Sequence, residues 1–373
     1  MFLSLNVLVE DSRRECLKPQ SPYSLIVRVV ISSLSLTISQ WYAFFLLSQL
    51  SFIIFPPVYG VIVFAIGFFG RIIGSLVFGY IGDKVGRRVS LLLTSLILAL
   101  SPIPVLVDYN YYSVVLLRLL QGLSLGGEWG GASTLMVEKY SESVHRGFIA
   151  STIQLAVPIS VLLSSISLYF SLADWRYYLL IDSLLALLST PFIEETGVSP
   201  SLTKNKEWGN VLKAIGIKVS ESANFYIFTS LVYAYVKGAS LLVSLAISLQ
   251  FVFLPLFGYL TDVIGRKNVV FIGVVLMALG SYLFKSEVGE IILSISDSAL
   301  YAPQSSIFTE IFDRRHRVTA SNFSYQTASV IGGFLAPALL RLTNSNVMLV
   351  TLPYLAVTTV STLLITETKG KKI

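Results

Sequence analysis

Apolar residues fill most of this chain in runs long enough to cross a lipid bilayer, and short polar segments separate the runs. A spanning helix needs about 20 apolar residues. In the first half this pattern predicts helices at 23–52, 57–80, 89–107, 112–137, 147–172 and 175–193. In the second half it predicts helices at 209–236, 239–260, 268–285, 288–311, 318–341 and 346–366. The predicted fold is an all-α integral membrane protein with twelve transmembrane helices in two six-helix bundles.

The polar segments place the boundaries between these units. We expect an N-terminal bundle at 23–193 and a C-terminal bundle at 208–366, joined by the polar linker EETGVSPSLTKNKE at 194–207. Residues 1–22 and 367–373 are expected to be cytoplasmic tails, each too short to fold a signalling domain.

Composition and charge placement agree with a membrane protein. Hydrophobic residues make up 54% of the chain and charged residues 13%, whereas a soluble chain carries about 25% charged residues. The net charge of +6 does not indicate nucleic-acid binding, because lysines and arginines collect in alternate loops and in both tails. The opposite loops hold only Arg176, Lys237, Lys285 and Arg341. The positive-inside rule therefore predicts a multi-pass protein of the cell (plasma) membrane with both termini in the cytoplasm.

One polar pattern occurs twice, about half a chain length apart. Residues 79–88 read GYIGDKVGRR and residues 258–267 read GYLTDVIGRK, each between two predicted helices. A charged hairpin repeated at this spacing is typical of a membrane carrier built from two equivalent halves.

The chemistry of the repeated pattern fits a contact that breaks and re-forms. Its first glycine lets a neighbouring helix approach closely, and its second supplies the unusual φ of a tight turn. Its aspartate ends a helix, where a carboxylate bonds to a helix N-terminus or to an arginine. The alternative is a topology signal without a gating role, but two copies at matching positions favour a gate. The predicted gate residues are Gly79, Asp83, Gly86, Arg87, Arg88, Gly258, Asp262, Gly265 and Arg266.

A second echo lies in the loops after the fourth and tenth predicted helices. Glu138 precedes the pair His145–Arg146, and Glu310 precedes the pair His316–Arg317. A titrating histidine pair is one interpretation, since histidine changes charge near neutrality. We favour two solvated positions in basic loops.

Ionisable residues also occur inside predicted helices, where a charge costs about 2.5–3.5 kcal/mol to insert. Arg71 lies near the middle of the second helix. Arg118, Gln121 and Glu128 share one face of the fourth helix, as their spacing places them within a narrow arc. We expect a functional role for the two arginines.

Three further acids fall within predicted helices. Asp182 lies near the start of the sixth helix, where it is close enough to reach the interface, so a structural role is favoured. For Glu221 in the seventh helix and Asp297 in the tenth, structural and functional roles both stay open.

These motifs carry a resemblance that covers nearly the whole chain. The two hairpins resemble the signature loops of the major facilitator superfamily. RLLQGLSLGGEWGGA in the fourth helix resembles the motif of its metabolite–proton symporters, which include carriers of proline and betaine, citrate, 2-oxoglutarate and shikimate. VEKYSESVHRG, DWRYYLLIDSLLALLSTPFIEET and EIFDRRHRVTASNFSYQTASVIGGFLAP are similar to later segments of that branch. The resemblance implies that Asp83, Arg87, Arg88, Asp262 and Arg266 hold the cytoplasmic gate.

The first helix departs from the branch. The branch has Glu-x-Tyr-Asp-Phe or a similar sequence, whereas residues 40–44 read QWYAF, so both acids implicated in coupling are absent. Gln40 and Tyr42 form hydrogen bonds but do not gain or lose a proton near neutral pH, so they cannot carry a coupling proton. Proton coupling then requires another carboxylate, such as Glu128 or Glu221, or does not occur. The loss leaves surplus positive charge, which favours an anionic substrate.

The leading prediction is a secondary active transporter that moves a small organic acid or related metabolite by alternating access, with proton symport. The alternatives are a uniporter, a proton-antiporting exporter and a transporter-like sensor that no longer transports. Helix 147–172 lacks the glycine-rich pattern usual in exporters, which counts against export. We expect a monomer in the lipid bilayer, with the proton as coupling ion and no other cofactor. The candidate substrate and coupling residues are Gln40, Tyr42, Arg71, Arg118, Gln121, Glu128, Glu221 and Asp297.

Enzymatic chemistry is not indicated. The sequence has no phosphate-binding Gly-x-x-x-x-Gly-Lys-(Ser/Thr) loop, which argues against direct drive by ATP. Both histidines lie in basic loops, where no catalytic set with serine and aspartate is indicated. With Cys16 as the single cysteine, we expect neither a disulfide nor a nitrogen- or sulfur-ligated metal site.

Overall fold

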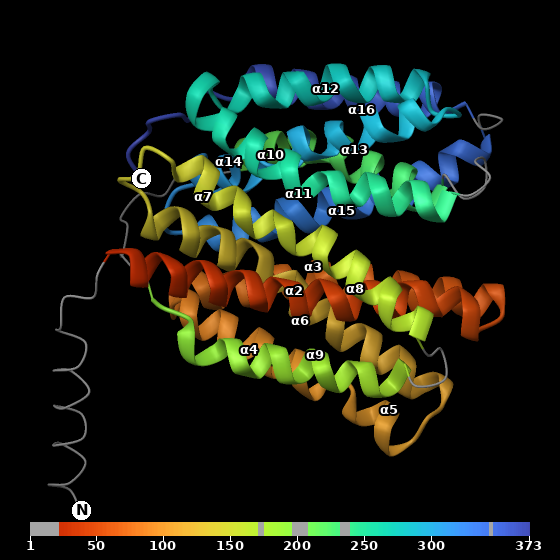
Figure 1. Cartoon of the computed structure of the whole chain (residues 1–373). Helices are drawn as coiled ribbons and strands as arrows, with labels where there is room; N and C mark the ends of the chain where they lie inside the picture. The colour runs from red at the N-terminus through yellow and green to blue at the C-terminus, as the bar shows by residue number, and fades with distance from the viewer. Residues whose placement is uncertain (1–21, 171–174, 196–207, 232–238, 343–345) are drawn as a thin grey trace, which may run out of the picture.

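The computed structural model describes residues 22–170, 175–195, 208–231, 239–342 and 346–373. Helices form nearly all of this part of the chain, and it contains no strand (Figure 1).

The helices of the first half follow the predicted apolar runs. They are α2 (Pro22–Ile54), α3 (Pro57–Lys84), α4 (Arg87–Leu100), α5 (Ile103–Val107), α6 (Tyr111–Lys139), α7 (Arg146–Ser151), α8 (Ala156–Phe170) and α9 (Trp175–Ser189). Short 3-10 turns at Thr152–Leu155 and Thr190–Phe192 join α7 to α8 and follow α9.

The second half repeats the arrangement. Its helices are α10 (Trp208–Tyr226), α11 (Ala239–Ile264), α12 (Arg266–Tyr282), α13 (Glu287–Tyr301), α14 (Gln304–Glu310), α15 (Arg317–Leu342) and α16 (Val347–Leu364). A π-helical turn at Ile227–Leu231 continues α10.

Three predicted helices are broken rather than continuous. The helix expected at 89–107 divides into α4 and α5 before Pro102, and the one at 288–311 divides into α13 and α14 at Pro303. The 3-10 turn between α7 and α8 precedes Pro158. Proline causes each break because it has no N–H for the carbonyl four residues earlier and its ring clashes with that carbonyl.

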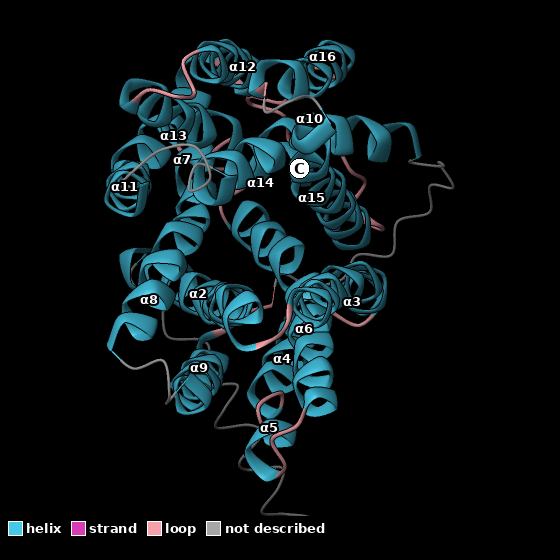
Figure 2. Cartoon of the chain, turned by 90° about the vertical axis from the view of Figure 1, so that its right-hand side faces the viewer, coloured by secondary structure: helices cyan, strands magenta, loops and turns pink. Residues whose placement is uncertain are grey.

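The helices of each half gather into one group and run along a common direction. Figure 2, which views them closer to end on, shows α2, α3, α4, α6, α8 and α9 in one group and α10 to α16 in the other. Helix α7 departs from its own group and packs against α11. The predicted linker at 194–207 lies outside the described residues except at its first two positions, as does the tail at 1–22 except Pro22.

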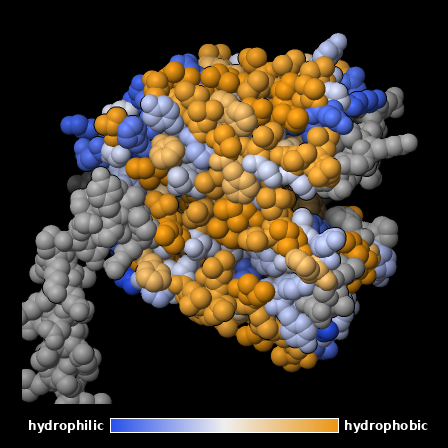
Figure 3. All heavy atoms as spheres, viewed as in Figure 1, coloured by the Kyte–Doolittle hydropathy of each residue, from blue (hydrophilic) through white to orange (hydrophobic). Residues whose placement is uncertain are grey.

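The surface is apolar across the middle. Hydrophobic residues cover the broad centre of the face in Figure 3, and hydrophilic residues concentrate toward the ends of the helices. In the described part, six helical segments are long and apolar enough to cross a membrane: Val29–Ser51, Val58–Lys84, Arg87–Val107, Arg146–Phe170, Leu241–Ile264 and Val347–Leu364. The number of crossings, predicted as twelve, stays a prediction.

Glycines bring α3 and α6 into close contact. A Cβ added at Gly74 would lie 2.0 Å from the carbonyl oxygen of Leu123, and one at Gly122 would lie 2.3 Å from that of Gly67. Small residues of this kind let membrane helices approach until their backbones touch. The contact fixes the position of Arg71 on α3 relative to the polar residues of α6.

Candidate functional site

A cavity lies between the two halves, with about 300 Å³ of empty space that includes the solvent at its opening. The first half supplies walls from α2, α3 and α8, and the second half supplies them from α10, α13 and α15. The lining residues are Trp41, Arg71, Val157, Lys218, Glu221, Ser222, Phe225, Tyr226, Tyr301, Tyr325 and Ser329.

Arg71 is the cation that the first half contributes. Its Nε atom donates a hydrogen bond to Gln326 Oε1 on α15 at 2.7 Å, which joins the two halves. Its guanidinium carbon lies 5.0 Å from the ring centroids of both Trp41 and Phe44. The side chain is buried, and neither its Nη1 nor its Nη2 atom has a well-aligned hydrogen bond to a described residue, although the Tyr226 hydroxyl beside it interacts with the guanidinium. Two such donors on a buried guanidinium in a cavity wall match the geometry of a carboxylate.

Lys218 and Glu221 form a buried ion pair on α10. The Lys218 Nζ atom donates to Glu221 Oε2, and Ser222 Oγ donates to the same oxygen at 3.2 Å. The ammonium also lies 3.8 Å from the ring centroid of Tyr325 and 5.2 Å from that of Tyr301, which gives it two cation–π contacts. Lys218 is 1% exposed and Glu221 is 5% exposed.

Sequence reasoning found Glu221 but not Lys218 as a site residue. Lys218 lies in the first half of the helix predicted at 209–236, where the sequence alone does not distinguish it from an exposed lysine. Its spacing of three residues from Glu221 was the available signal, since such residues are neighbours on a helix surface.

Asp297 lies behind the cavity wall rather than in it. Its two carboxylate oxygens accept hydrogen bonds from Gln250 Nε2 at 2.8 Å and from Asn224 Nδ2 at 3.4 Å. Asp297 is therefore fixed by α11 and α10 and is buried, with 1% exposure.

The polar face of α6 points inward, but within the first half. The Arg118 Nη1 and Nη2 atoms donate to the carbonyl oxygen of Phe44 at 2.8 Å and to Ser48 Oγ at 2.6 Å. Glu128 Oε1 accepts from Thr37 at 2.6 Å. Arg118 and Glu128 therefore hold α6 against α2, and neither lines the cavity.

The remaining candidates in the first half are also buried away from the cavity wall. Gln40 accepts a hydrogen bond from Ser124 at 2.8 Å, and the Tyr42 hydroxyl pairs with Ser167 at 2.8 Å. The Gln121 side chain has no hydrogen-bond partner among the described residues. Asp182 is 1% exposed and does not reach the surface, in contrast to the expectation from its place in the sequence.

The two charged hairpins lie at the same end of the molecule, which we call the hairpin end. We call the set of contacts between each hairpin and the opposite half a clasp. In the first clasp, Asp83 Oδ1 accepts a hydrogen bond from the backbone N–H of Val318 at 3.0 Å. Asp83 Oδ2 accepts from the backbone N–H of Thr319 at 2.9 Å and from its hydroxyl at 2.6 Å. The aspartate of the first half thus binds the start of α15 in the second half.

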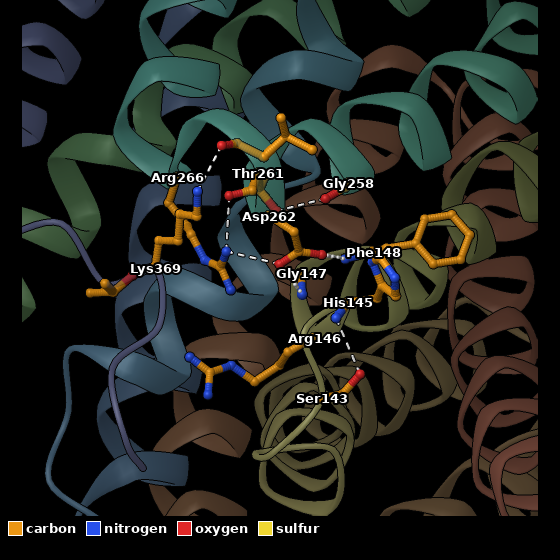
Figure 4. Close-up of polar contacts among 12 residues, drawn as sticks. Ser143, His145, Arg146, Gly147, Phe148, Gly258, Thr261, Asp262, Arg266 and Lys369 are labelled. Atoms are coloured by element: carbon orange, nitrogen blue, oxygen red, sulfur yellow. Dashed lines mark hydrogen bonds and ion pairs between the residues drawn. The ribbon is translucent and has the colours of Figure 1, made fainter.

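The second clasp mirrors the first with the halves exchanged. Asp262 accepts from the backbone N–H groups of Gly147 and Phe148, both at 2.8 Å, at the start of α7. It also pairs with Arg266 at 2.9 Å on its own side, as Figure 4 shows. The corresponding pair in the first clasp, Asp83–Arg87, is longer at 3.9 Å.

Two glutamates complete the clasps. Glu138 forms ion pairs with Arg87 of its own half at 3.2 Å and with Arg317 of the other half at 2.8 Å. Glu310 receives Arg266 and, across the halves, Arg146 at 2.7 Å. The repeated Glu…His–Arg pattern therefore marks carboxylate–arginine pairs. The His145 ring instead stacks on Tyr259, with ring centroids 6.0 Å apart.

Each hairpin turn is also fixed by a glutamate that sequence reasoning missed. Gly86 and Gly265 have φ of 147° and 98°, as their turns require. Beyond them, Glu195 accepts from the first two backbone N–H groups of α4, and Glu367 from those of α12. Burial raises the pKa of Glu367, but its bonds to four backbone N–H groups outweigh burial and lower it overall.

A membrane-embedded pair of repeats around a charged cavity, with matched clasps at one end, defines a transporter. Residues 28–198 match the family model for sugar (and other) transporters, and residues 214–372 match the model for the major facilitator superfamily. The chain belongs to the major facilitator superfamily, and it is not an enzyme.

Two relatives in Escherichia coli and one solved structure are similar to this chain. The chain is 25% identical to the shikimate transporter of Escherichia coli K12, over 83% of this chain and 86% of that protein. It is 27% identical to the alpha-ketoglutarate permease of the same organism, over 73% and 74% respectively. The fold is similar to that of the proton:xylose symporter XylE bound to 6-bromo-6-deoxy-D-glucose, with a TM-score of 0.74 and 16% identity over 94% of this chain and 98% of XylE.

Proposed function

We propose that this protein is a proton symporter that carries a small organic acid across the cell membrane by alternating access. The observation that carries the proposal is Arg71, a buried guanidinium in the wall of the central cavity whose two Nη atoms form no well-aligned hydrogen bond to a described residue and lie beside the Tyr226 hydroxyl. An unpaired buried cation is costly unless a ligand pairs with it, and a carboxylate matches a guanidinium in charge and shape.

The charge of the cavity supports an anionic cargo. Its lining contains two cations, Arg71 and Lys218, and one carboxylate, Glu221. The wall therefore carries one surplus positive charge when Glu221 is ionised, which attracts anions into a cavity of low polarity. Two of the relatives are named for the organic acids shikimate and alpha-ketoglutarate.

The lining of the cavity supports a polar cargo. Serine and tyrosine hydroxyls line it beside aromatic faces, so polar groups on the cargo have partners there.

The clasps support alternating access. Both aspartates grip the helix start of the opposite half, so the hairpin end stays closed while these bonds persist. Breaking them would let the halves separate there while they close at the other end. By the placement of basic residues, we assign the hairpin end and both termini to the cytoplasm.

Uptake into proteoliposomes tests this function. Purified protein is given labelled shikimate, alpha-ketoglutarate, proline or betaine, with and without an inward proton gradient. We expect the gradient to drive accumulation of an organic acid. Equilibration of a compound without accumulation would indicate a uniporter. Outward movement of a compound would indicate an exporter, and no movement of any compound would indicate the sensor.

Arg71→Ala is the decisive variant, and it should abolish uptake without loss of folded protein. The matched control is Arg176→Ala, which removes another arginine that lies over an aromatic ring, here Tyr109 at 4.9 Å, but outside the cavity. Normal uptake by Arg71→Ala would show that this arginine does not hold the cargo.

A further inference from the structure

The Lys218–Glu221 pair is placed where a cargo can interrupt it. Both side chains line the cavity, and Glu221 is the carboxylate in its described wall. Among the described residues, only Glu221 accepts a hydrogen bond from Lys218 Nζ, which has three N–H groups to donate. The rings of Tyr325 and Tyr301 hold the ammonium by their faces and take none of these donors.

Among the groups around Lys218, Glu221 is the carboxylate in contact with its ammonium, and Asp297 attracts the ammonium without a hydrogen bond. Helix α13 presents Asp297 and Tyr301, but Asp297 is held behind the wall by neutral amides. Helix α15 presents Tyr325, and its charged residues lie only near its two ends. The sequence of α16 contains no acidic or basic residue. The remaining titratable groups facing the cavity are Tyr226 on α10 itself and Arg71 on α3.

We propose that Lys218 and Glu221 form a proton-controlled anion site, in which the cargo carboxylate and Glu221 compete for the same ammonium. This inference rests on the proposed function of the cavity as an organic-acid site. A proton from cavity water binds Glu221 Oε2 and converts the carboxylate to a neutral acid. The Lys218 ammonium keeps its three protons and pairs with the cargo carboxylate beside Arg71. On release of the cargo, the ammonium returns to Glu221 and the proton passes to water on that side.

This exchange conserves the charge buried between the halves. The empty cavity holds two cations and one carboxylate. With one proton on Glu221 and one cargo carboxylate present, it holds two cations and one carboxylate again. The lining carries one surplus positive charge in both states, so the cost of enclosing it between the halves is the same for the empty and the loaded carrier. One proton therefore accompanies each cargo molecule with one carboxylate, and the coupling site lies in the second half, far in sequence from the acids missing at residues 40–44.

Calorimetric titration of purified protein in detergent tests the site directly, with shikimate and alpha-ketoglutarate as probes, from about pH 6 to about pH 8.5. Wild-type affinity should fall as pH rises across this range, by up to about tenfold for each pH unit. Glu221→Gln imitates the protonated acid, so it should bind with the affinity of the wild type at low pH and show no pH dependence over this range.

Three further variants separate this role from a structural one. Lys218→Gln should bind at least about tenfold more weakly than Glu221→Gln at every pH, because the cargo loses one charge-assisted bond. The double variant Lys218→Gln/Glu221→Gln keeps the net charge of the wild-type pair and should be folded, weak-binding and insensitive to pH. Glu194→Gln is the matched control, since it breaks the Lys139–Glu194 pair outside the cavity and should titrate like the wild type.

The outcomes distinguish this site from the transport proposal. The same pH dependence in Glu221→Gln and wild type, or binding of neither probe to either protein, would overturn the site. Arg71-dependent uptake with unchanged pH dependence in Glu221→Gln would leave transport standing without it. The expected binding pattern without uptake into liposomes would support the site and count against transport.

Discussion

Asp83→Asn should loosen the hairpin end while leaving the protein folded. Asp83 is 4% exposed, and its contacts with α15 cross between the halves, so they exist only while this end is closed. Asparagine keeps one acceptor oxygen, turns an amide NH₂ toward backbone donors and removes the negative charge at the start of α15.

The magnitude follows from the bonds that are lost. A hydrogen bond to a charged group contributes about 1.5–3 kcal/mol, and a charge at a helix N-terminus about 0.3–1 kcal/mol. The closed form should therefore lose about 2–4 kcal/mol relative to the open one. At about 1.4 kcal/mol per tenfold, this shifts the equilibrium by about 30- to 1,000-fold toward opening at the hairpin end.

Distances between spin labels on the two halves, obtained by double electron–electron resonance spectroscopy, measure this shift. Spin labels at Val144→Cys and His316→Cys, in a Cys16→Ser background, report from corresponding exposed loops of the two halves at the hairpin end. Asp83→Asn should add a population at longer distance. Asp108→Asn, which changes an exposed aspartate bonded to Asn110, is the matched control. A distance distribution identical to the wild type in Asp83→Asn would refute the view that this carboxylate holds the end closed.

Two further predictions concern packing and the hairpin turns. Gly74→Ala should lower the thermal unfolding temperature markedly, because its Cβ would lie 2.0 Å from the Leu123 carbonyl oxygen. The control Gly209→Ala should not lower it, because nothing lies within 4 Å of the added Cβ. Equal unfolding temperatures for the two variants would contradict tight α3–α6 packing. Because folding lowers the pKa of Glu367, its ionised carboxylate should stabilise the folded protein fully above its ordinary pKa of 4.5. This stabilisation should disappear as the pH falls through the lowered pKa. Glu367→Gln should therefore reduce stability near neutrality more than in acid, measured by thermal unfolding at both pH values.

The sequence predicted the helices well because long apolar runs leave few other structures in a bilayer. The breaks before Pro102 and at Pro303 were missed because length and hydropathy do not register a single lost N–H. The two hairpins were predicted with their aspartates and arginines, since the pattern Gly-x-x-x-Asp-x-x-Gly-Arg occurs twice in the sequence. Their partners Val318 and Gly147 were not, because the contacts cross between halves and involve backbone groups.

The cavity was harder to predict than the hairpins. Helical periodicity placed Arg118 and Glu128 on one face, but it does not say which neighbour that face meets, and here it meets α2. Arg71 and Glu221 line one cavity because of how the two halves dock. The spacing of Lys218 three residues before Glu221 indicated that the two are neighbours on the helix, but it did not show that the pair is buried.

The exchange of partners at the hairpin end has the form of an isologous interface within one polypeptide. In such an interface, residue i of one copy contacts residue j of the other and the reverse also holds. Asp83 and Asp262 follow this rule, as do Glu138 and Glu310. The two copies are not identical, since the aspartate–arginine distance is 3.9 Å in one and 2.9 Å in the other.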